Sequence, residues 1–242
     1  MIWRSLICFS SISVAVFAAC GATLSGTVVL RDSRVDAVNK QKDFSGVVVS
    51  AQPMGGPLSG QLGPPPAAHA TMQQKGKMFK PHVLPVMAGT TVDFPNFDPI
   101  FHNAFSSYNG QIFDVGLYPP GTSRSVRLTT TGVLRVFCNI HSTMSAIILV
   151  LNTPYMAKTA KSGSFEMEVP PGEYELSVFH ERSTEQELAN LTRRVVVPEA
   201  GLRVPPIMVS EAGYLVAPHK NKYGHDYPPS SDDQVFYPGV RH

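Results

Sequence analysis

One short segment, residues 137–144, places three potential metal ligands close together: Phe137-Cys138-Asn139-Ile140-His141-Ser142-Thr143-Met144. Cys138, His141 and Met144 offer a thiolate, an imidazole and a thioether. Copper that changes oxidation state prefers soft sulfur beside imidazole nitrogen, and two histidines, one cysteine and a weak axial methionine form blue-copper electron-transfer sites. The segment therefore predicts three ligands of one copper ion, and a second histidine has to come from elsewhere in the chain.

The second histidine is predicted to be His102, which lies in the segment Asn96-Phe97-Asp98-Pro99-Ile100-Phe101-His102-Asn103. Taken alone, a histidine with apolar neighbours is more often a partly buried structural residue than a ligand. Together with the three residues of the loop it completes one coordination type. Zinc is the rival metal for one cysteine and two histidines, but zinc rarely takes methionine.

The other histidines are predicted to have no part in this site. His82 has apolar neighbours, yet nothing in the sequence pairs it with the ligand loop. The remaining ones are expected to be solvated or structural: His69, His180, His219, His225 and His242.

The N-terminus has the layout of a secretory signal over residues 1–22: a positive charge at Arg4, an apolar run and then small residues. The run is too short for a bilayer span. Phe17-Ala18-Ala19-Cys20 resembles a bacterial lipobox, which predicts membrane anchoring through a lipidated Cys20. Cleavage after Ala22 would instead release a soluble protein. Both alternatives predict export, and we expect a periplasmic location.

Cysteine usage supports the metal site. Cys8 and Cys20 belong to the proposed signal, so Cys138 is the one cysteine of the mature chain. Cysteines in an oxidising compartment normally form disulfides, and an odd one needs an explanation. Either Cys138 is a small buried hydrophobe or it binds a metal, and His141 and Met144 beside it favour the metal.

Composition excludes little else. The net charge of +2 gives no electrostatic reason to expect nucleic acid as a partner. With 21 prolines and 19 glycines, and without long amphipathic windows, the chain is expected to form short strands joined by turns. Residues 25–30 and 44–50 are predicted strands, and the polar residues 31–42 between them a loop. The Gly/Pro-rich residues 53–68 form a predicted linker, because proline does not fit a central strand.

Residues 69–151 are denser in strand signals. Several segments alternate apolar with polar residues, as strands with one face in a sandwich core do. The predicted strands are 70–73, 82–87, 90–94, 101–105, 123–129, 132–137 and 145–151.

These residues resemble the cupredoxins. The resemblance rests on Met78-Phe79-Lys80-Pro81, Thr91-Val92-Asp93-Phe94, His102-Asn103 and the spacing Cys138-x2-His141-x2-Met144, which is most similar to amicyanin. It implies an all-β fold, a cupredoxin Greek-key β-sandwich, with one type 1 copper that cycles between Cu(II) and Cu(I). By this likeness His102, Cys138 and His141 form the trigonal plane, Met144 is the axial ligand, and Asn103 hydrogen-bonds the cysteine loop.

The same resemblance implies a function. A protein of this kind carries single electrons between redox partners, here cytochrome c or a periplasmic dehydrogenase or oxidase, through the exposed edge of His141. Relatives with this arrangement are labelled methylamine-utilisation proteins. We expect no enzyme activity, since a copper oxidase or nitrite reductase needs a second, His-rich centre and the chain has no His-x-His element. Two alternatives remain: a copper carrier or buffer of the envelope, and a binding module with a structural metal.

After residue 151 the pattern changes. Residues 161–178 alternate around Pro170-Pro171-Gly172, which predicts a hairpin. The segment resembles the carboxypeptidase regulatory-like, transthyretin-like β-sandwich, with last strands at 191–197 and 203–210.

That second domain, residues 152–210, has too few strands by itself. Residues 23–52 resemble its opening strands, so one hypothesis places the cupredoxin inside it, since insertions are tolerated at loop tips. The alternative is a tandem in which the early strands belong to the cupredoxin. The polar, proline-rich tail, residues 211–242, is expected to be extended or disordered, or to lie as an arm over the other domain.

Overall fold

The computed structural model describes residues 21–55, 68–107, 110–213 and 219–227. The predicted signal up to Cys20, most of the predicted linker and the last part of the tail lie outside these residues. The protein is all-β, with two short helices among the described residues. No helix there is long and apolar enough to cross a bilayer.

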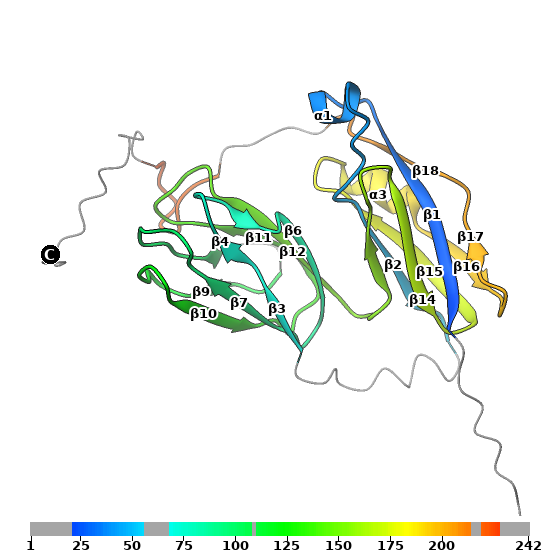
Figure 1. Ribbon diagram of the computed structural model, residues 1–242, viewed down its shortest axis with the longest axis horizontal. Coiled ribbons are helices and arrows are strands. Elements are labelled where there is room, and N and C mark those ends of the chain that lie inside the picture. The colour runs from blue at the N-terminus through cyan, green and yellow to red at the C-terminus, as the bar shows by residue number, and fades with distance from the viewer. Residues whose placement is uncertain (1–20, 56–67, 108–109, 214–218, 228–242) are drawn as a thin grey trace, which may run out of the picture.

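The strands form two groups that lie side by side in Figure 1. We call the group between residues 69 and 151 the inserted sandwich, and the group formed by the remaining strands the outer sandwich. The inserted sandwich contains β3 (His69–Thr71), β4 (Gln73–Gln74), β5 (Phe79–Lys80), β6 (Val83–Met87), β7 (Thr91–Pro95), β8 (Phe105–Ser106), β9 (Phe113–Asp114), β10 (Ser123–Arg127), β11 (Gly132–Phe137) and β12 (Ser145–Leu151).

The outer sandwich contains elements from both ends of the chain. They are β1 (Ala22–Arg31), α1 (Asp36–Asn39), β2 (Val48–Pro53), β13 (Met156–Lys158), β14 (Ser164–Val169), β15 (Gly172–Phe179), α3 (Glu185–Leu191), β16 (Arg193–Val197), β17 (Leu202–Arg203) and β18 (Ile207–Ser210).

Each sandwich packs two main sheets around an apolar core. The inserted sandwich has the sheets β10-β7-β3 and β6-β12-β11-β8-β9, with the small pair β4-β5 beside them. The outer sandwich has the sheets β14-β1-β17, in which β1 also pairs with β18, and β13-β2-β15-β16. Buried side chains of both sheets meet in one cluster in each case, such as Phe94 with Ile148, and Leu24 with Tyr174.

The two early strands pair with strands that come after the inserted sandwich. β1 runs antiparallel to β14 and parallel to β18, and the Val28 N–H donates to Gly163 O at 2.8 Å. β2 runs antiparallel to β13 and β15. Neither strand pairs with a described strand of the inserted sandwich. This pairing supports the nested domain arrangement, while the family of the outer sandwich stays a prediction.

The hairpin predicted around Pro170-Pro171-Gly172 is wrong. Strands β14 and β15 lie on either side of it, but β14 pairs with β1 whereas β15 pairs with β2 and β16. The turn therefore carries the chain from one sheet to the other, and the Tyr174 hydroxyl donates to Pro170 O at 2.6 Å across it. Alternation shows that each strand has one buried face, but it does not show which strand is its neighbour.

Two further predictions near the N-terminus are wrong in detail. The predicted loop 31–42 contains the helix α1. The strand predicted at 44–50 begins only at Val48, because Gly46 has a φ of 83°, in the left-handed region that breaks an extended chain.

Strand β12 is buried on both faces, which explains its continuous apolar run. One face joins the core of the inserted sandwich and the other contacts the outer sandwich. The first face consists of Ala146, Ile148 and Val150. Ile147 and Leu149 on the second face cluster with Val83 of β6 and Val48 of β2. β12 therefore packs against both sandwiches. Its first residue, Ser145, directly follows the last residue of the predicted metal loop, Met144.

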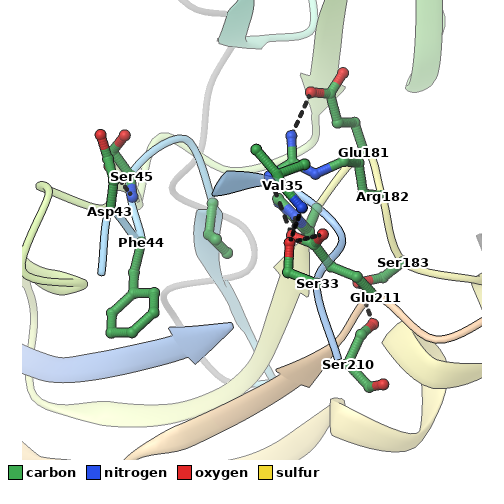
Figure 2. A network of polar contacts seen from close by, with 12 residues as sticks. Ser33, Val35, Asp43, Phe44, Ser45, Glu181, Arg182, Ser183, Ser210 and Glu211 are labelled. Atoms are coloured by element: carbon green, nitrogen blue, oxygen red, sulfur yellow. Dashed lines mark hydrogen bonds and ion pairs between the residues drawn. The ribbon is translucent and has the colours of Figure 1, made fainter. Parts of the chain in front are cut away.

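A polar network joins the segments that follow β1, β15 and β18 of the outer sandwich (Figure 2). The Glu211 carboxylate accepts hydrogen bonds from the Ser33 hydroxyl at 2.6 Å and from the Arg182 guanidinium at 3.0 Å. Arg182 also donates to Glu181 at 3.2 Å. Glu181 in turn contacts His82 of the inserted sandwich at 2.7 Å. The network therefore adds a polar contact between the sandwiches to the apolar one.

Candidate metal centre

The ligand loop joins two paired strands. β11 and β12 are antiparallel, and Phe137 opposite Ser145 is the last pair of their ladder. Inside the loop, the Cys138 N–H donates to Met144 O at 3.2 Å and the Met144 N–H to His141 O at 3.1 Å. These bonds close the loop, so the three predicted loop ligands are held at one end of the inserted sandwich.

His102 is held opposite this loop by an isolated bridge. Its N–H donates to Tyr118 O at 3.2 Å, and the Tyr118 N–H returns a bond to His102 O at 2.9 Å. The strand predicted at 101–105 is wrong, because β8 begins only at Phe105. Side-chain bonds to the backbone replace it: the Asp98 N–H donates to Asn96 Oδ1 at 3.0 Å, and Asn96 Nδ2 to Ile100 O at 2.8 Å. Such local bonds compete with regular strands.

Three of the predicted ligands come together. Cys138 Sγ lies 3.6 Å from His141 Nδ1 and 3.9 Å from His102 Nδ1. Cys138 and His102 are fully buried and His141 is partly exposed. Metal–sulfur and metal–nitrogen bonds of about 2.3 and 2.0 Å at tetrahedral to trigonal angles would set sulfur and nitrogen roughly 3.5–3.7 Å apart. The observed spacing therefore fits one metal ion, and within the described residues no other such cluster occurs.

Met144 completes the predicted set. Its side chain is fully buried and belongs to the same apolar cluster as Cys138. The closed loop places Met144 three residues after His141 and directly before β12, and its role as a ligand stays a prediction.

Asp98 supports His102 and is a residue that the sequence analysis missed. His102 Nε2 contacts Asp98 Oδ2 at 2.8 Å, which leaves Nδ1 turned toward the cysteine. The Gly76 and Lys77 N–H groups donate to the same carboxylate at 2.6 and 2.8 Å. A carboxylate that bonds the far nitrogen of a ligating histidine fixes its tautomer and orientation. The signal in the sequence is an acidic residue four positions before the histidine.

The pKa values in the centre suit metal binding. Burial lowers the pKa of His102, although Asp98 opposes this, so the neutral imidazole that ligates a metal is favoured. Burial would raise the pKa of Asp98, but the Lys77 and Gly76 N–H groups and His102 together lower it. Burial raises the pKa of the Cys138 thiol, against backbone hydrogen bonds from Ile140, Asn103 and His141. A bound cation supplies the charge that a buried thiolate needs.

Asn103 links the two halves of the centre, as the resemblance implied. Its Oδ1 accepts from the Asn139 N–H at 3.2 Å. Its Nδ2 donates to Asp114 Oδ1 at 2.7 Å and to Gly116 O at 3.0 Å. The side chain therefore spans from the His102 segment to the ligand loop and anchors both to the Asp114 turn.

The described part of the tail, residues 219–227, also lies against the ligand loop. His219 and Tyr227 make hydrogen bonds to backbone carbonyls of the loop. The tail was expected to be extended or disordered, or to be an arm over the other domain, and these residues take the arm position. No spacing in the sequence connects them to the loop, since the contact bridges more than 75 residues.

These features define a class: an all-β protein with a buried cluster of sulfur and nitrogen donors that could hold a metal ion. No protein-family model and no curated protein matches the chain. Among solved structures, it is similar to the copper-containing nitrite reductase NirK from Thermus scotoductus SA-01, with 28% identity and a TM-score of 0.34. That match covers 37% of this chain and 23% of the reductase, so the chain spans about a quarter of the reductase's length.

Two further similar structures are a cupredoxin and an amicyanin variant. The purple cupredoxin from Nitrosopumilus maritimus has 21% identity and a TM-score of 0.31, over 35% of this chain and 99% of its own. A reduced variant of amicyanin has 17% identity and a TM-score of 0.33, over 35% of this chain and 83% of its own.

Proposed function

We propose that this protein carries single electrons by means of one type 1 copper ion. His102, Cys138 and His141 would be the main ligands of the copper, and Met144 would be the weak fourth ligand. The observation that carries the proposal is the position of the buried Cys138 Sγ, 3.6 and 3.9 Å from two imidazole nitrogens that approach it from different segments. Copper, when bound, supplies the one-electron chemistry.

The donor set favours copper over zinc. Structural zinc sites use cysteine, histidine and carboxylate ligands, whereas a thioether beside Cys and two His is the set of electron-transfer copper. Among the described residues, the Asp98 carboxylate is bonded to His102, and it lies at the ring nitrogen that faces away from Cys138. The chain's own contribution is a rigid site that excludes water, since Cys138, His102 and Met144 are fully buried. A site that keeps its geometry allows electrons to move with little rearrangement.

The partly exposed His141 is the proposed path for the electron. Its partners are proposed to be redox proteins, cytochrome c or a periplasmic dehydrogenase or oxidase, that dock transiently over small interfaces. We further propose a periplasmic location, with a membrane anchor if Cys20 is lipidated, and that the outer sandwich is a carboxypeptidase regulatory-like, transthyretin-like domain. No substrate chemistry is proposed.

The test is to add Cu(II) to the mature protein and record visible absorption and EPR spectra, with Cys138→Ser as the control. We expect an intense thiolate-to-copper band and narrow copper hyperfine splitting, both absent from the control. A colourless protein, or a weak spectrum that survives Cys138→Ser, would contradict the proposal. Binding of Cu(I) alone, with ready release, would instead identify a copper carrier.

A further inference from the structure

Residues 219–227 form a short segment that we call the C-terminal brace. It lies at the loop end of the inserted sandwich, in orange in Figure 1. His219 Nε2 donates to Ser142 O at 2.7 Å, and the Tyr227 hydroxyl donates to Cys138 O at 2.8 Å. Between these two, the Lys222 N–H donates to Asn139 Oδ1 at 3.0 Å. The brace therefore bonds the ligand loop at three points, one of them the carbonyl of the cysteine itself.

The brace has an internal structure that presents its two ends to the loop. Asn221 closes a turn, since its Oδ1 accepts from the Tyr223 and His225 N–H groups at 3.0 and 3.1 Å. The turn brings the ends together, and the Tyr227 hydroxyl lies 3.3 Å from His219 Nδ1. The His219 ring also stacks on Phe137, with centroids 4.0 Å apart and an angle of 24° between the planes.

The brace and Asn103 share one anchor. Lys222 Nζ pairs with Asp114 Oδ2 at 2.7 Å, while Asn103 Nδ2 donates to Asp114 Oδ1 at 2.7 Å. Asn103 also holds the Asn139 N–H, and Lys222 holds the Asn139 side chain. Asn139, next to the cysteine, is therefore fixed from both sides by groups that meet at one carboxylate.

We propose that the C-terminal brace positions the metal-binding loop, with Tyr227 and His219 as positioning residues. The effect on copper rests on the function proposed above, whereas the effect on the loop does not need copper. The brace holds the carbonyls at both ends of the 138–142 segment, so the segment opens less often. Less opening keeps Cys138 from solvent, and in the loaded protein it keeps the ligands in place.

The loop effect is measured on the full-length chain without metal. The rate at which iodoacetamide alkylates Cys138 is followed by peptide mass spectrometry, which separates Cys138 from the other cysteines. The double variant His219→Ala/Tyr227→Phe should react roughly tenfold faster than the wild type, because losing two hydrogen bonds and a ring stack corresponds to at least one factor of ten in an opening equilibrium. Tyr227→Phe alone removes one hydroxyl and should give roughly a threefold increase.

The matched control is Tyr223→Phe/His225→Ala, which changes the same residue types in the same turn. Tyr223 is 68% exposed and His225 is also exposed. This control should react at the wild-type rate. Equal rates in the double variant, the control and the wild type would overturn the proposal, as would an unchanged rate in Tyr227→Phe if the double variant unfolds.

Copper-loaded protein provides the second reading. Transfer of copper to a chelator should be roughly tenfold faster in the double variant, with a changed EPR hyperfine splitting. If the wild type forms no type 1 copper but the alkylation rates differ as expected, the proposal for the brace is supported and the proposed electron-carrier function is contradicted. If type 1 copper forms and neither alkylation nor transfer changes, the brace fails while the function stands.

Discussion

Two buried histidines in this protein have nearly the same surroundings at one ring nitrogen and different surroundings at the other. His102 lies in the inserted sandwich with Nε2 2.8 Å from Asp98, and His180 lies in the outer sandwich with Nε2 2.9 Å from Glu211. Both imidazoles are almost fully buried. In both, burial lowers the pKa and the carboxylate opposes the change.

The difference lies at the second ring nitrogen. His102 Nδ1 faces Cys138 Sγ, whereas within the described residues His180 Nδ1 is buried without a hydrogen-bond partner. The carboxylates differ as well. Asp98 is held by backbone N–H groups, while Glu211 is held by Arg182 and Ser33 and so ties strand ends together (Figure 2). A carboxylate partner therefore does not by itself identify a buried histidine as a candidate metal ligand. What distinguishes His102 is the sulfur atom that faces its second ring nitrogen.

Replacing each histidine by alanine should separate the two roles most strongly. His102→Ala should weaken copper binding by roughly 100-fold, because removing a proposed ligand should cost at least as much as removing a partner that orients a ligand, which is about 10–100-fold. His180→Ala should leave copper affinity unchanged and lower the free energy of unfolding by about 1–3 kcal/mol, the cost of a broken buried hydrogen bond. Chelator competition and urea unfolding measure the two quantities. Equal copper affinities in the two variants would contradict the assignment of His102, and not His180, as a metal ligand.

Substitutions of the two carboxylates should also differ in their effect on copper affinity, but by less than the histidine substitutions do. Asp98→Asn keeps the side-chain shape but removes the charge that orients His102, and should weaken copper binding by about tenfold. Glu211→Gln is the matched change in the other pair and should leave copper affinity at the wild-type value. The same chelator competition checks both. A larger loss in Glu211→Gln than in Asp98→Asn would show that the metal site depends on the outer sandwich.

Much of the metal centre could be predicted because its signal is local. Cys138, His141 and Met144 share one loop, and their chemistry together led to the copper prediction. His102 was found because few histidines remained and its neighbours matched a known pattern. Asp98 was missed although it lies only four residues before His102, since an acidic residue in a turn has many ordinary explanations. The brace could not be found, because its contacts depend on where the tail is folded back and not on any spacing.

The fold shows the same limit at larger scale. The alternating pattern at 161–178 predicted two half-buried strands, and both exist, as β14 at 164–169 and β15 at 172–179. Their pairing was wrong because partners are set by the whole sandwich, in which β1 and β2 come from the other end of the chain. Residues 145–151 were predicted as a strand, but only the structure shows that β12 is buried on both faces and that its second face meets the outer sandwich.

A third histidine–carboxylate pair, half-exposed, should respond to pH in the opposite direction. Glu181 accepts a hydrogen bond from His82 Nε2 at 2.7 Å and raises the pKa of His82 above its ordinary value of about 6.5. The folded protein then holds the proton more tightly, so this pair stabilises fully below about pH 6.5 and its contribution is lost as the pH rises through the raised pKa. For His180 burial lowers the pKa, so its contribution is present above about pH 6.5 and is lost as the pH falls toward the lowered value.

Urea unfolding of His82→Ala and His180→Ala beside the wild type, at about pH 5.5 and about pH 8, checks both signs. The free energy of unfolding of the wild type should exceed that of His82→Ala by more at the lower pH. The difference should stay under about 1 kcal/mol, because the His82 side chain is 48% exposed. The free energy of unfolding of the wild type should exceed that of His180→Ala by more at the higher pH. The same sign for both variants would mean that burial, which distinguishes these two pairs, does not control how each imidazole contributes to stability.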